Sequence, residues 1–339
     1  YYPMYLVTTH HHRLPTDHQI IMVDGTVPQW VPQPGDLHWD HHCPGGAPIQ
    51  VLDMPLPHAT TLLAEQGTDA PVCFTTTQVD ADACVAAAWV QLPRSILIQP
   101  DSAARLQSIA WDCDHLGVPP HLDPWGDFAA TVVAALKVQA DRLRQELDLP
   151  DDRHQWQPSD WERYHSTAFE QGTQHLMGAA LGDRPWPGEA GEAVDYWRQA
   201  ETDRVQLQQE GRVWFVPTAT GQVAVCDLRG IDRAVDPRVF YQVLAQKSDC
   251  QNLRPETLTW RDRPLGGQGY TLGSIPLHPR QADLDYTRGT LARITAAEQA
   301  KSGYPAPWGG RKVVGGSPWN RPSVLTPEEV VTAIDGGMV

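Results

Sequence analysis

The chain lacks an apolar run long enough to cross a bilayer. Its longest uninterrupted apolar run, residues 83–90, is far shorter than the roughly 20 residues that a membrane-spanning helix needs. No basic segment followed by an apolar one opens the sequence, so we expect no secretory signal. These two absences predict a protein that works without a membrane partner.

Basic residues are also scarce. The 339 residues include 26 Lys and Arg against 41 Asp and Glu, which gives a formal net charge of −15. This charge argues against a binder of duplex nucleic acid, because such binding depends on neutralising many phosphates. A small phosphate-bearing ligand held by a local site is still compatible with an acidic chain.

Cysteine is sparse, and several common signatures are missing. The six cysteines form no C-x-x-C pair and no regular framework, so we expect reduced, mostly buried thiols in a cytoplasmic protein rather than disulfides or a zinc ribbon. The sequence contains no G-x-S-x-G elbow, no G-x-x-x-x-G-K-[ST] loop and no G-x-G-x-x-G after a strand. It also shows no internal repeat, which excludes solenoids and propellers.

What is present predicts an α/β protein of about two domains. In the first 125 residues, short apolar runs that end in turn residues favour buried strands of a mostly parallel sheet. The expected strands are residues 20–23, 71–74 and 95–98, and the alanine-rich residues 83–92 are expected to form a helix on that sheet. We place this first domain at residues 1–150.

The rest of the chain predicts a helical connector at residues 151–211 and a smaller α/β domain at residues 212–339. Apolar residues repeat every three or four positions from residue 127 onward, which is typical of helices. Ser159 and Glu162 match a capping box, and a further helix is expected over residues 189–210. Strand-like runs return at residues 213–216, 222–226 and 270–273, with helices expected near residues 237–244, 284–297 and after Thr326.

Acidic or histidine-bearing segments follow four of the apolar runs in the first domain. They are Asp24, then Asp40 with His41 and His42, then Asp80 with Asp82, and finally Asp112 with Asp114. Carboxylates that follow buried parallel strands point into one crevice at the carboxyl edge of the sheet. Mn²⁺ and Mg²⁺ prefer such oxygen-rich sites, and Mn²⁺ also accepts a histidine.

Each segment also has a structural interpretation. Asp24 and the glycine after it form a common turn dipeptide. Asp80 and Asp82 suit the cap of the helix that follows them, and Asp112 and Asp114 suit a solvated helix end. The three histidines at 10–12 are expected to lie in a solvated loop, and core or interface packing is enough to explain the 13 tryptophans.

Taken together, the runs IIMVDG, LHWDHH, VCFTTTQVDADA and IAWDCDHLG resemble the DHH phosphoesterases with their attached DHHA1 domain. That family consists of two-metal, usually manganese-dependent phosphoesterases whose substrates include oligonucleotides, cyclic dinucleotides, pyrophosphate and polyphosphate. The resemblance covers residues 20–320 approximately. It implies two Mn²⁺ or Mg²⁺ ions and a small phosphate-bearing substrate in a cleft between the domains.

The resemblance also assigns roles to residues. It implies metal ligands at Asp24, Asp80, Asp82 and His42 and at Asp112 or Asp114, catalytic roles for His41 and His42, and an orienting role for Asp40. The segment WGGRKVVGGSPWN looks like the family's substrate loop. Its expected substrate-binding residues are Gly309, Gly310, Arg311, Lys312, Gly315, Gly316 and Ser317.

The sequence departs from the family pattern in two ways that keep alternatives open. The D-x-D segment follows the DHH segment instead of preceding it, which needs a permuted strand arrangement. Thr76 stands where the family has a histidine, and Ser317 with the proline after it replaces the loop histidine. One alternative is therefore a non-catalytic relative that binds a nucleotide or phosphate. Another is a structural or interaction protein whose acidic cluster is only surface, and a homodimer is compatible with each of these functions.

Overall fold

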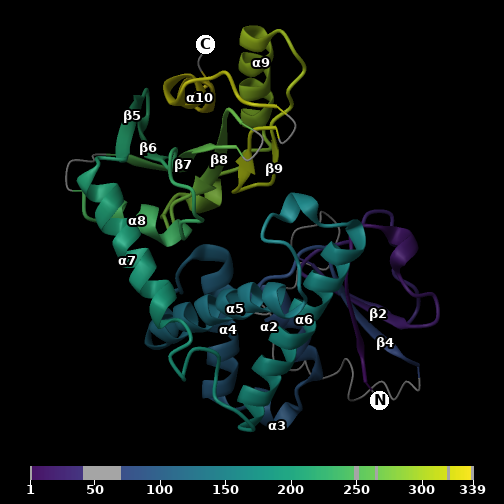
Figure 1. The fold of residues 1–339 in the computed structure, drawn as a ribbon. Helices are drawn as coiled ribbons and strands as arrows, with labels where there is room; N and C mark the ends of the chain where they lie inside the picture. The colour runs from purple at the N-terminus through teal and green to yellow at the C-terminus, as the bar shows by residue number, and fades with distance from the viewer. Residues whose placement is uncertain (1, 41–69, 248–251, 264–265, 319–320, 337–339) are drawn as a thin grey trace. The chain divides into compact units, whose positions relative to one another are not determined.

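The structure, a computed structural model, describes residues 2–40, 70–247, 252–263, 266–318 and 321–336. Its contacts divide the chain into two compact units, Tyr1–Trp197 and Arg198–Val339. Each unit contains a sheet and helices, which confirms the expected α/β class (Figure 1). Within the described ranges, no helix combines the length and the hydropathy that a transmembrane segment requires.

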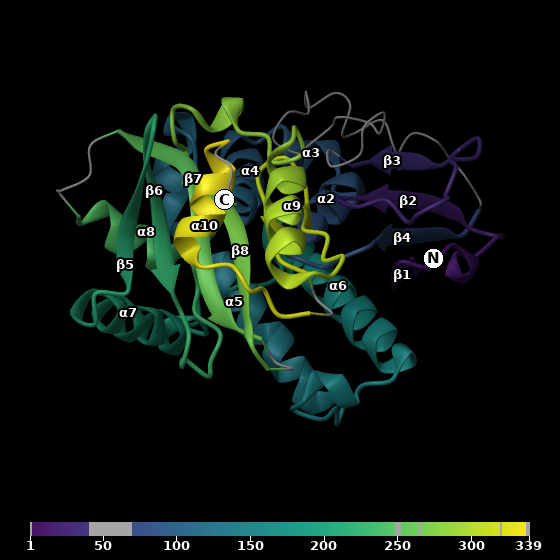
Figure 2. The same cartoon turned by 90° about the horizontal axis from the view of Figure 1, so that it is seen from above.

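The N-terminal unit is built on a four-stranded sheet whose pairings are all parallel. The strands lie side by side in the order β1-β4-β2-β3 (Figure 2). Their bounds are β1 Met4–Val7, β2 Gln19–Val23, β3 Leu37–Trp39 and β4 Val72–Thr76. Because the strands run in one direction, the segments that follow them begin at a common carboxyl edge of the sheet.

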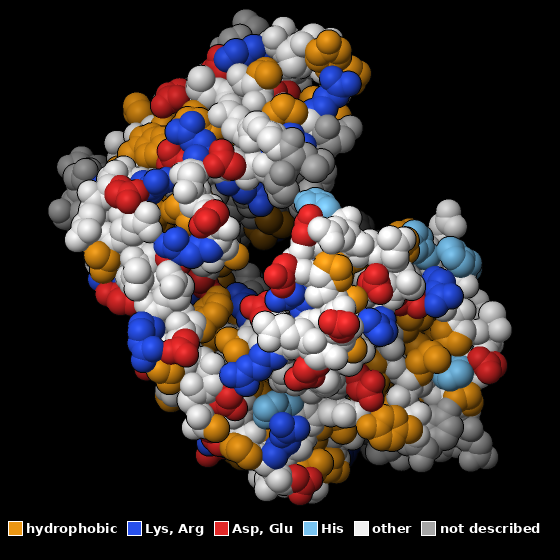
Figure 3. Space-filling view, viewed as in Figure 1, with side chains coloured by type: hydrophobic (Ala, Val, Ile, Leu, Met, Phe, Trp, Pro, Cys, Tyr) orange, Lys and Arg blue, Asp and Glu red, His pale blue; other side chains and the backbone are white. Residues whose placement is uncertain are grey.

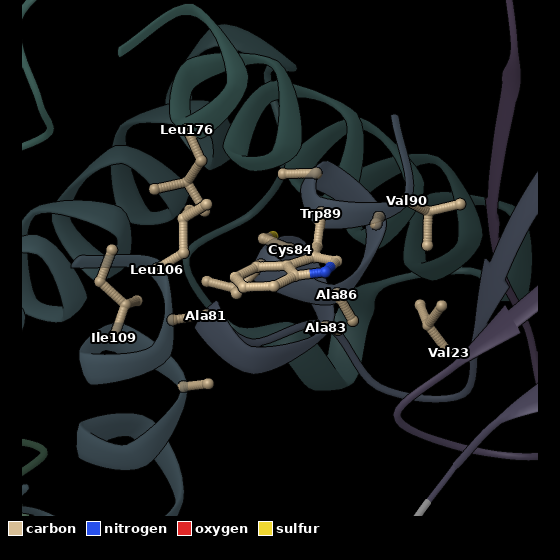
Figure 4. Packing of buried hydrophobic residues seen from close by; sticks show 14 of the residues in the cluster. Val23, Ala81, Ala83, Cys84, Ala86, Trp89, Val90, Leu106, Ile109 and Leu176 are labelled. Atoms are coloured by element: carbon tan, nitrogen blue, oxygen red, sulfur yellow. The ribbon is translucent and has the colours of Figure 1, made fainter. Parts of the chain in front are cut away.

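Two helices of this unit, α2 Ala81–Gln91 and α6 Pro158–Leu181, pack against the sheet. The other three, α3 Arg94–Leu97, α4 Pro100–His115 and α5 Gly126–Glu146, pack on these two helices and on one another. The centre of the packing is Trp89 of α2, a fully buried side chain (Figure 4). Alanines along α2 let its neighbours approach closely, and on α6 a Cβ at Gly172 would lie only 2.8 Å from Cys84 Sγ. This packing holds α2 against α4 and α6.

The C-terminal unit contains a six-stranded sheet in the order β5-β6-β7-β8-β10-β9. Its strands are β5 Val213–Thr218, β6 Gly221–Asp227, β7 Leu253–Asp262, β8 Gln268–Ser274, β9 Gly309–Gly310 and β10 Gly315–Gly316. Its helices are α8 Pro237–Ala245, α9 Thr290–Ser302 and α10 Pro327–Ile334, and α9 and α10 pack over one face of the sheet (Figure 2). Helix α7, Val194–Gln209, carries the chain from one unit to the other.

The units divide the chain differently from the expected boundaries at residues 150 and 211. Helix α6 lies in the expected connector, yet it packs against α2 and β1 as part of the N-terminal unit. Phe169 and Leu176 of α6 belong to the same buried cluster as Trp89. The apolar face of α6 is therefore buried only because it packs against the first sheet and its helices.

Several expected elements begin elsewhere or have another structure. Residues 95–98, expected as a strand, form the end of the short helix α3 and the turn after it, because a four-residue apolar run fits a helix as well as a strand. Helix α7 begins at Val194 rather than at 189, since Gly188 and Gly191 adopt left-handed backbone angles. Helix α9 begins at Thr290 after the left-handed Gly289, rather than at residue 284.

The start of α6 also differs in detail. A capping box is present, but Gln157 and Asp160 form it, not Ser159 and Glu162. Pro158 takes the first helical position, where a proline loses no hydrogen bond. Glu162 is left to pair with Arg13, at 2.5 Å.

The described cysteines are all free thiols, as expected. They are Cys73, Cys84, Cys113 and Cys226. Burial raises the pKa of Cys73 to about 11 and of Cys226 to about 12, which keeps both protonated and unreactive at neutral pH.

Candidate functional site

The carboxyl edge of the first sheet carries Asp24 directly after β2. Its backbone N–H donates to the carbonyl of Trp39 at 2.8 Å, at the end of the neighbouring strand β3. On the other side, Thr76 Oγ1 at the end of β4 lies 3.5 Å from the Asp24 carbonyl oxygen. The residue adopts a left-handed backbone with φ of 47°, which aspartate tolerates better than most residues. The two neighbouring strands therefore hold Asp24 in place.

Asp80 and Asp82 lie at the start of α2, four and six residues after β4 ends. Asp80 is the N-cap of the helix, and its Oδ1 accepts a hydrogen bond from the Ala83 amide at 2.9 Å. Asp82 lies in the first turn and is only 3% exposed. The positive end of the helix dipole favours a carboxylate at both positions. The expected cap is present, and it orients Asp80.

Asp112 and Asp114 do not follow a strand as expected. They lie in the last turn of α4, because the apolar residues before them are the buried stripe of a helix, Leu106, Ile109 and Ala110. Asp112 is 2% exposed. Of the two, Asp114 is the one whose charge raises the pKa of both Asp24 and Asp82.

Asp24, Asp80, Asp82 and Asp114 form a four-aspartate cluster. Burial raises the pKa of Asp24 well above its usual value, and the charges of the other three members raise it further. The pKa of Asp82 is raised in the same way, first by burial and then by the charges of Asp114 and Asp80. Asp24 shares a hydrogen bond with Asp80, and Asp82 shares one with Asp114. Three separate segments thus bring four carboxyl groups together.

Such a cluster is stable only if its charge is compensated, by shared protons or by a cation. Its oxygen donors fit Mn²⁺ or Mg²⁺. The described residues do not by themselves complete a group of three or more His, Cys, Asp or Glu side chains placed around a metal. His41 and His42, the expected histidine ligands and catalytic residues, lie outside the described residues.

Asp40 belongs to a small network with Thr26 and His38, of which only Asp40 was predicted from the sequence. It is 1% exposed, and its Oδ2 accepts a hydrogen bond from the Thr26 hydroxyl at 2.6 Å. Thr26 Oγ1 also lies 2.7 Å from Nε2 of His38. Because the hydroxyl donates to Asp40, it accepts from His38, so Nε2 carries the proton. Side chains alternate between the two faces of a strand, so His38 and Asp40 lie on the same side of β3. This alternation could have predicted from the sequence that the two residues belong together.

The expected substrate residues of the C-terminal unit form a β-hairpin at the edge of its sheet. Gly310 is needed for packing, because a Cβ there would lie 2.4 Å from the Val314 carbonyl oxygen. The Arg311 amide donates to that same carbonyl at 2.7 Å, which closes the turn. Ser317 joins the hairpin to β8, since its Oγ accepts from the Tyr270 amide at 2.8 Å. Arg311 and Lys312 are exposed at the turn.

The pKa shifts predict how the stability of the metal-free protein depends on pH. Asp24 and Asp82 have folded-state pKa values well above their usual 3.8, so between 3.8 and these raised values the folded state binds more protons than the unfolded state. Their contribution to the free energy of unfolding is therefore lost as pH rises through the folded-state values. In EDTA, we expect the Asp82→Asn variant to lose less Tm than the wild type as the pH is raised above the usual carboxyl pKa of 3.8. Equal slopes in the two proteins would contradict this prediction.

Neither the protein-family models nor the curated proteins contain a match to this chain. Among solved structures, the chain is similar to PggH, a pGpG-specific phosphodiesterase from Vibrio cholerae. The identity is 9% and the TM-score 0.40, with 94% of this chain and 98% of that chain covered. A likeness this weak assigns neither a family nor an activity.

Proposed function

We propose that the chain is a metal-dependent phosphoesterase that hydrolyses a phosphodiester or phosphoanhydride in a nucleotide-like or small phosphate substrate. The observation that carries the proposal is the four-aspartate cluster at the carboxyl edge of a parallel sheet. Ligand sites of such sheets lie at this edge. The resemblance of the surrounding sequence to the DHH phosphoesterases supports the same reaction class.

Asp24, Asp80, Asp82 and Asp114 would hold two Mn²⁺ or Mg²⁺ ions, together with His42. When bound, such ions lower the pKa of a water and neutralise charge on the phosphoryl oxygens. The chain's own residues orient these ligands. Ala83 fixes one oxygen of Asp80, and the ends of β3 and β4 fix the backbone of Asp24. Asp40, held by Thr26, would orient a neighbouring histidine, and His41 or His42 would move a proton.

One observation favours a non-catalytic binder of nucleotides or phosphate as a second candidate. Thr76 stands at the position where the related family has a histidine, and it is fully buried. Its hydroxyl lies 3.1 Å from the Gln78 carbonyl oxygen and 3.5 Å from that of Asp24, so it serves the local backbone. A site that needs a ligand from this position would therefore bind its ions less tightly.

Turnover separates the two candidates. The full chain is assayed on dinucleotides, cyclic dinucleotides and pyrophosphate with Mn²⁺, and again in EDTA. We expect hydrolysis of at least one substrate with Mn²⁺ and none in EDTA. Binding of the same compounds without any turnover would contradict the esterase and support the binder. If the chain shows no binding and no turnover of any of these compounds, both candidates are contradicted.

The exposed arginine of the C-terminal hairpin is proposed to contact a substrate phosphate. Arg311→Ala is expected to weaken binding of a phosphate ligand by about 1–3 kcal/mol, because a charge-assisted hydrogen bond is lost. The Mn²⁺ affinity of the Arg311→Ala variant should equal that of the wild type. Both affinities are measured by calorimetry on the full chain, with Arg288→Ala as the control, since Arg288 has an 86% exposed side chain. Equal phosphate affinities of Arg311→Ala and wild type would contradict this role.

A further inference from the structure

A large groove in the N-terminal unit has no role in the function proposed so far. It has a volume of about 1490 Å³, and three segments line it. The first is β1 with the loop after it as far as Pro15. The second is Thr77 with Gln78 after β4, and the third begins at Arg153, before α6, and ends at Glu170 within α6. We call it the β1–α6 groove. Figure 3 shows histidine, Lys and Arg side chains beside hydrophobic ones on the right of this face.

One wall of the groove carries stacked aromatic rings. Trp161, in the first turn of α6, is 39% exposed, although tryptophan is usually buried. Its ring stacks on that of His165, with the centroids 5.0 Å apart and the planes at 17°. Trp156 lies edge-on to Trp161 at 5.3 Å, and the guanidinium of Arg153 lies 5.3 Å from the Trp156 ring. An exposed ring backed by a second ring is a surface on which a planar ligand can stack.

His165 adds a polar group to this wall. Burial, together with the charge of Arg153, lowers its pKa to about 4, so its ring is neutral at pH 7. Its buried Nδ1 has no hydrogen-bond partner among the described residues. The neutral, buried imidazole therefore backs the Trp161 ring as an uncharged stacking partner.

The other end of the groove reaches the sheet edge that carries the four-aspartate cluster. Thr77 lines the groove, and a Cβ on Gly25, the residue after Asp24, would lie 2.4 Å from its Oγ1. The rings of His10 and His12, 5.6 Å apart, line the same end after β1. A ligand in the groove can therefore extend toward Asp24.

A peptide that adds to the sheet edge fits the groove less well. β1 is an edge strand, and a peptide would need its outward amides. The Val7 amide already donates to the Ser166 hydroxyl at 2.9 Å, so α6 occupies that edge. Stacking of a planar ring needs no free backbone group.

We propose that the β1–α6 groove binds a nucleobase of the substrate, which stacks on Trp161, with its phosphate directed toward the four-aspartate cluster. This inference rests on the proposed function and narrows the substrate to one that carries a nucleobase. Inorganic pyrophosphate and polyphosphate would leave the groove empty. Trp161 would then set specificity without taking part in the reaction.

Binding without metal tests the groove directly. AMP and GMP are titrated into the full chain in EDTA, with inorganic phosphate as the ligand that lacks a base. Trp161→Ala is expected to weaken mononucleotide binding roughly 5- to 150-fold, the effect of losing one stacked base. Trp161→Phe should restore most of the affinity. Tyr304→Ala, which removes an exposed aromatic of the other unit, should change nothing.

The outcomes separate this inference from the proposed function. Mononucleotide affinity that Trp161→Ala leaves unchanged overturns the groove site, even if the enzyme hydrolyses phosphodiesters. Nucleotide binding in EDTA that depends on Trp161 upholds the site, even if no substrate is turned over. A groove that binds an extended peptide but no nucleotide would also overturn it.

Discussion

Asp82→Asn is expected to reduce turnover with Mn²⁺ strongly and to remove most of the rise in Tm that Mn²⁺ produces. Asp82 is 3% exposed, and the charges of Asp114 and Asp80 raise its pKa. Asparagine keeps the shape of the side chain but removes the negative charge that would attract a cation. An ion at 100 times its dissociation constant stabilises the folded protein by about 2.7 kcal/mol, and this gain should largely disappear. Turnover should fall on the order of a hundredfold or more.

The two effects are measured on one preparation, by thermal unfolding over a range of Mn²⁺ concentrations and by initial rates. Asp101→Asn is the matched control, because Asp101 is an exposed aspartate in the first turn of α4. It should keep both the Tm rise and the turnover. A normal Mn²⁺-induced rise in Asp82→Asn would place the ions elsewhere.

Glu298→Ala is expected to destabilise the C-terminal unit by about 3 kcal/mol or more. Glu298 of α9 is fully buried, and its carboxylate accepts three hydrogen bonds. The donors are Trp308 Nε1 at 3.1 Å, the Ser323 hydroxyl at 2.6 Å and the Val324 amide at 2.7 Å. The substitution leaves these buried donors unsatisfied, at about 1–3 kcal/mol each.

The hairpin of β9 and β10 should loosen in the same variant. Trp308 directly precedes the hairpin and stacks on Tyr270 of β8, with ring centroids 5.8 Å apart. Hydrogen exchange of the full chain, read separately for residues 1–197 and 198–339, should show faster exchange only in the second range. Glu328→Ala, at an exposed position of α10, should cost less than about 1 kcal/mol. Unchanged protection around Trp308 would contradict a stabilising role for Glu298.

The sequence predicted best those elements that bury a continuous apolar stretch. Strands β2 and β4, helices α2 and α5, and the β5–β6 hairpin were all expected near their observed positions. Strand β7 was missed because its ten residues include Arg254, Pro255 and Glu256 and show no apolar run. Its polar groups are paired within the fold, with Arg254 bonded to Glu256 at 2.7 Å and to Asp335 at 2.5 Å. A residue pair 81 positions apart leaves no local pattern to read.

In the candidate site, too, some residues could be placed from the sequence and others could not. Asp24 could be placed from the strand before it, and Asp80 from the helix after it. Asp114 could not, because it reaches the cluster only through the packing of α4 against α2. The expected strand before Asp112 was wrong, since the period of its apolar residues is that of a helix. The exposure of Trp161 was also missed, because no pattern in the sequence indicates which of the 13 tryptophans is exposed.

Anomalous diffraction at the manganese absorption edge, from crystals of the full chain grown with Mn²⁺, tests the four-aspartate cluster as a metal site. We expect an anomalous peak among the carboxyl oxygens of Asp24, Asp80, Asp82 and Asp114. The same peak should be absent from crystals of Asp82→Asn grown in the same way. A manganese peak elsewhere in the wild type, with these four carboxyl groups free of metal, would show that the cluster is not the metal site.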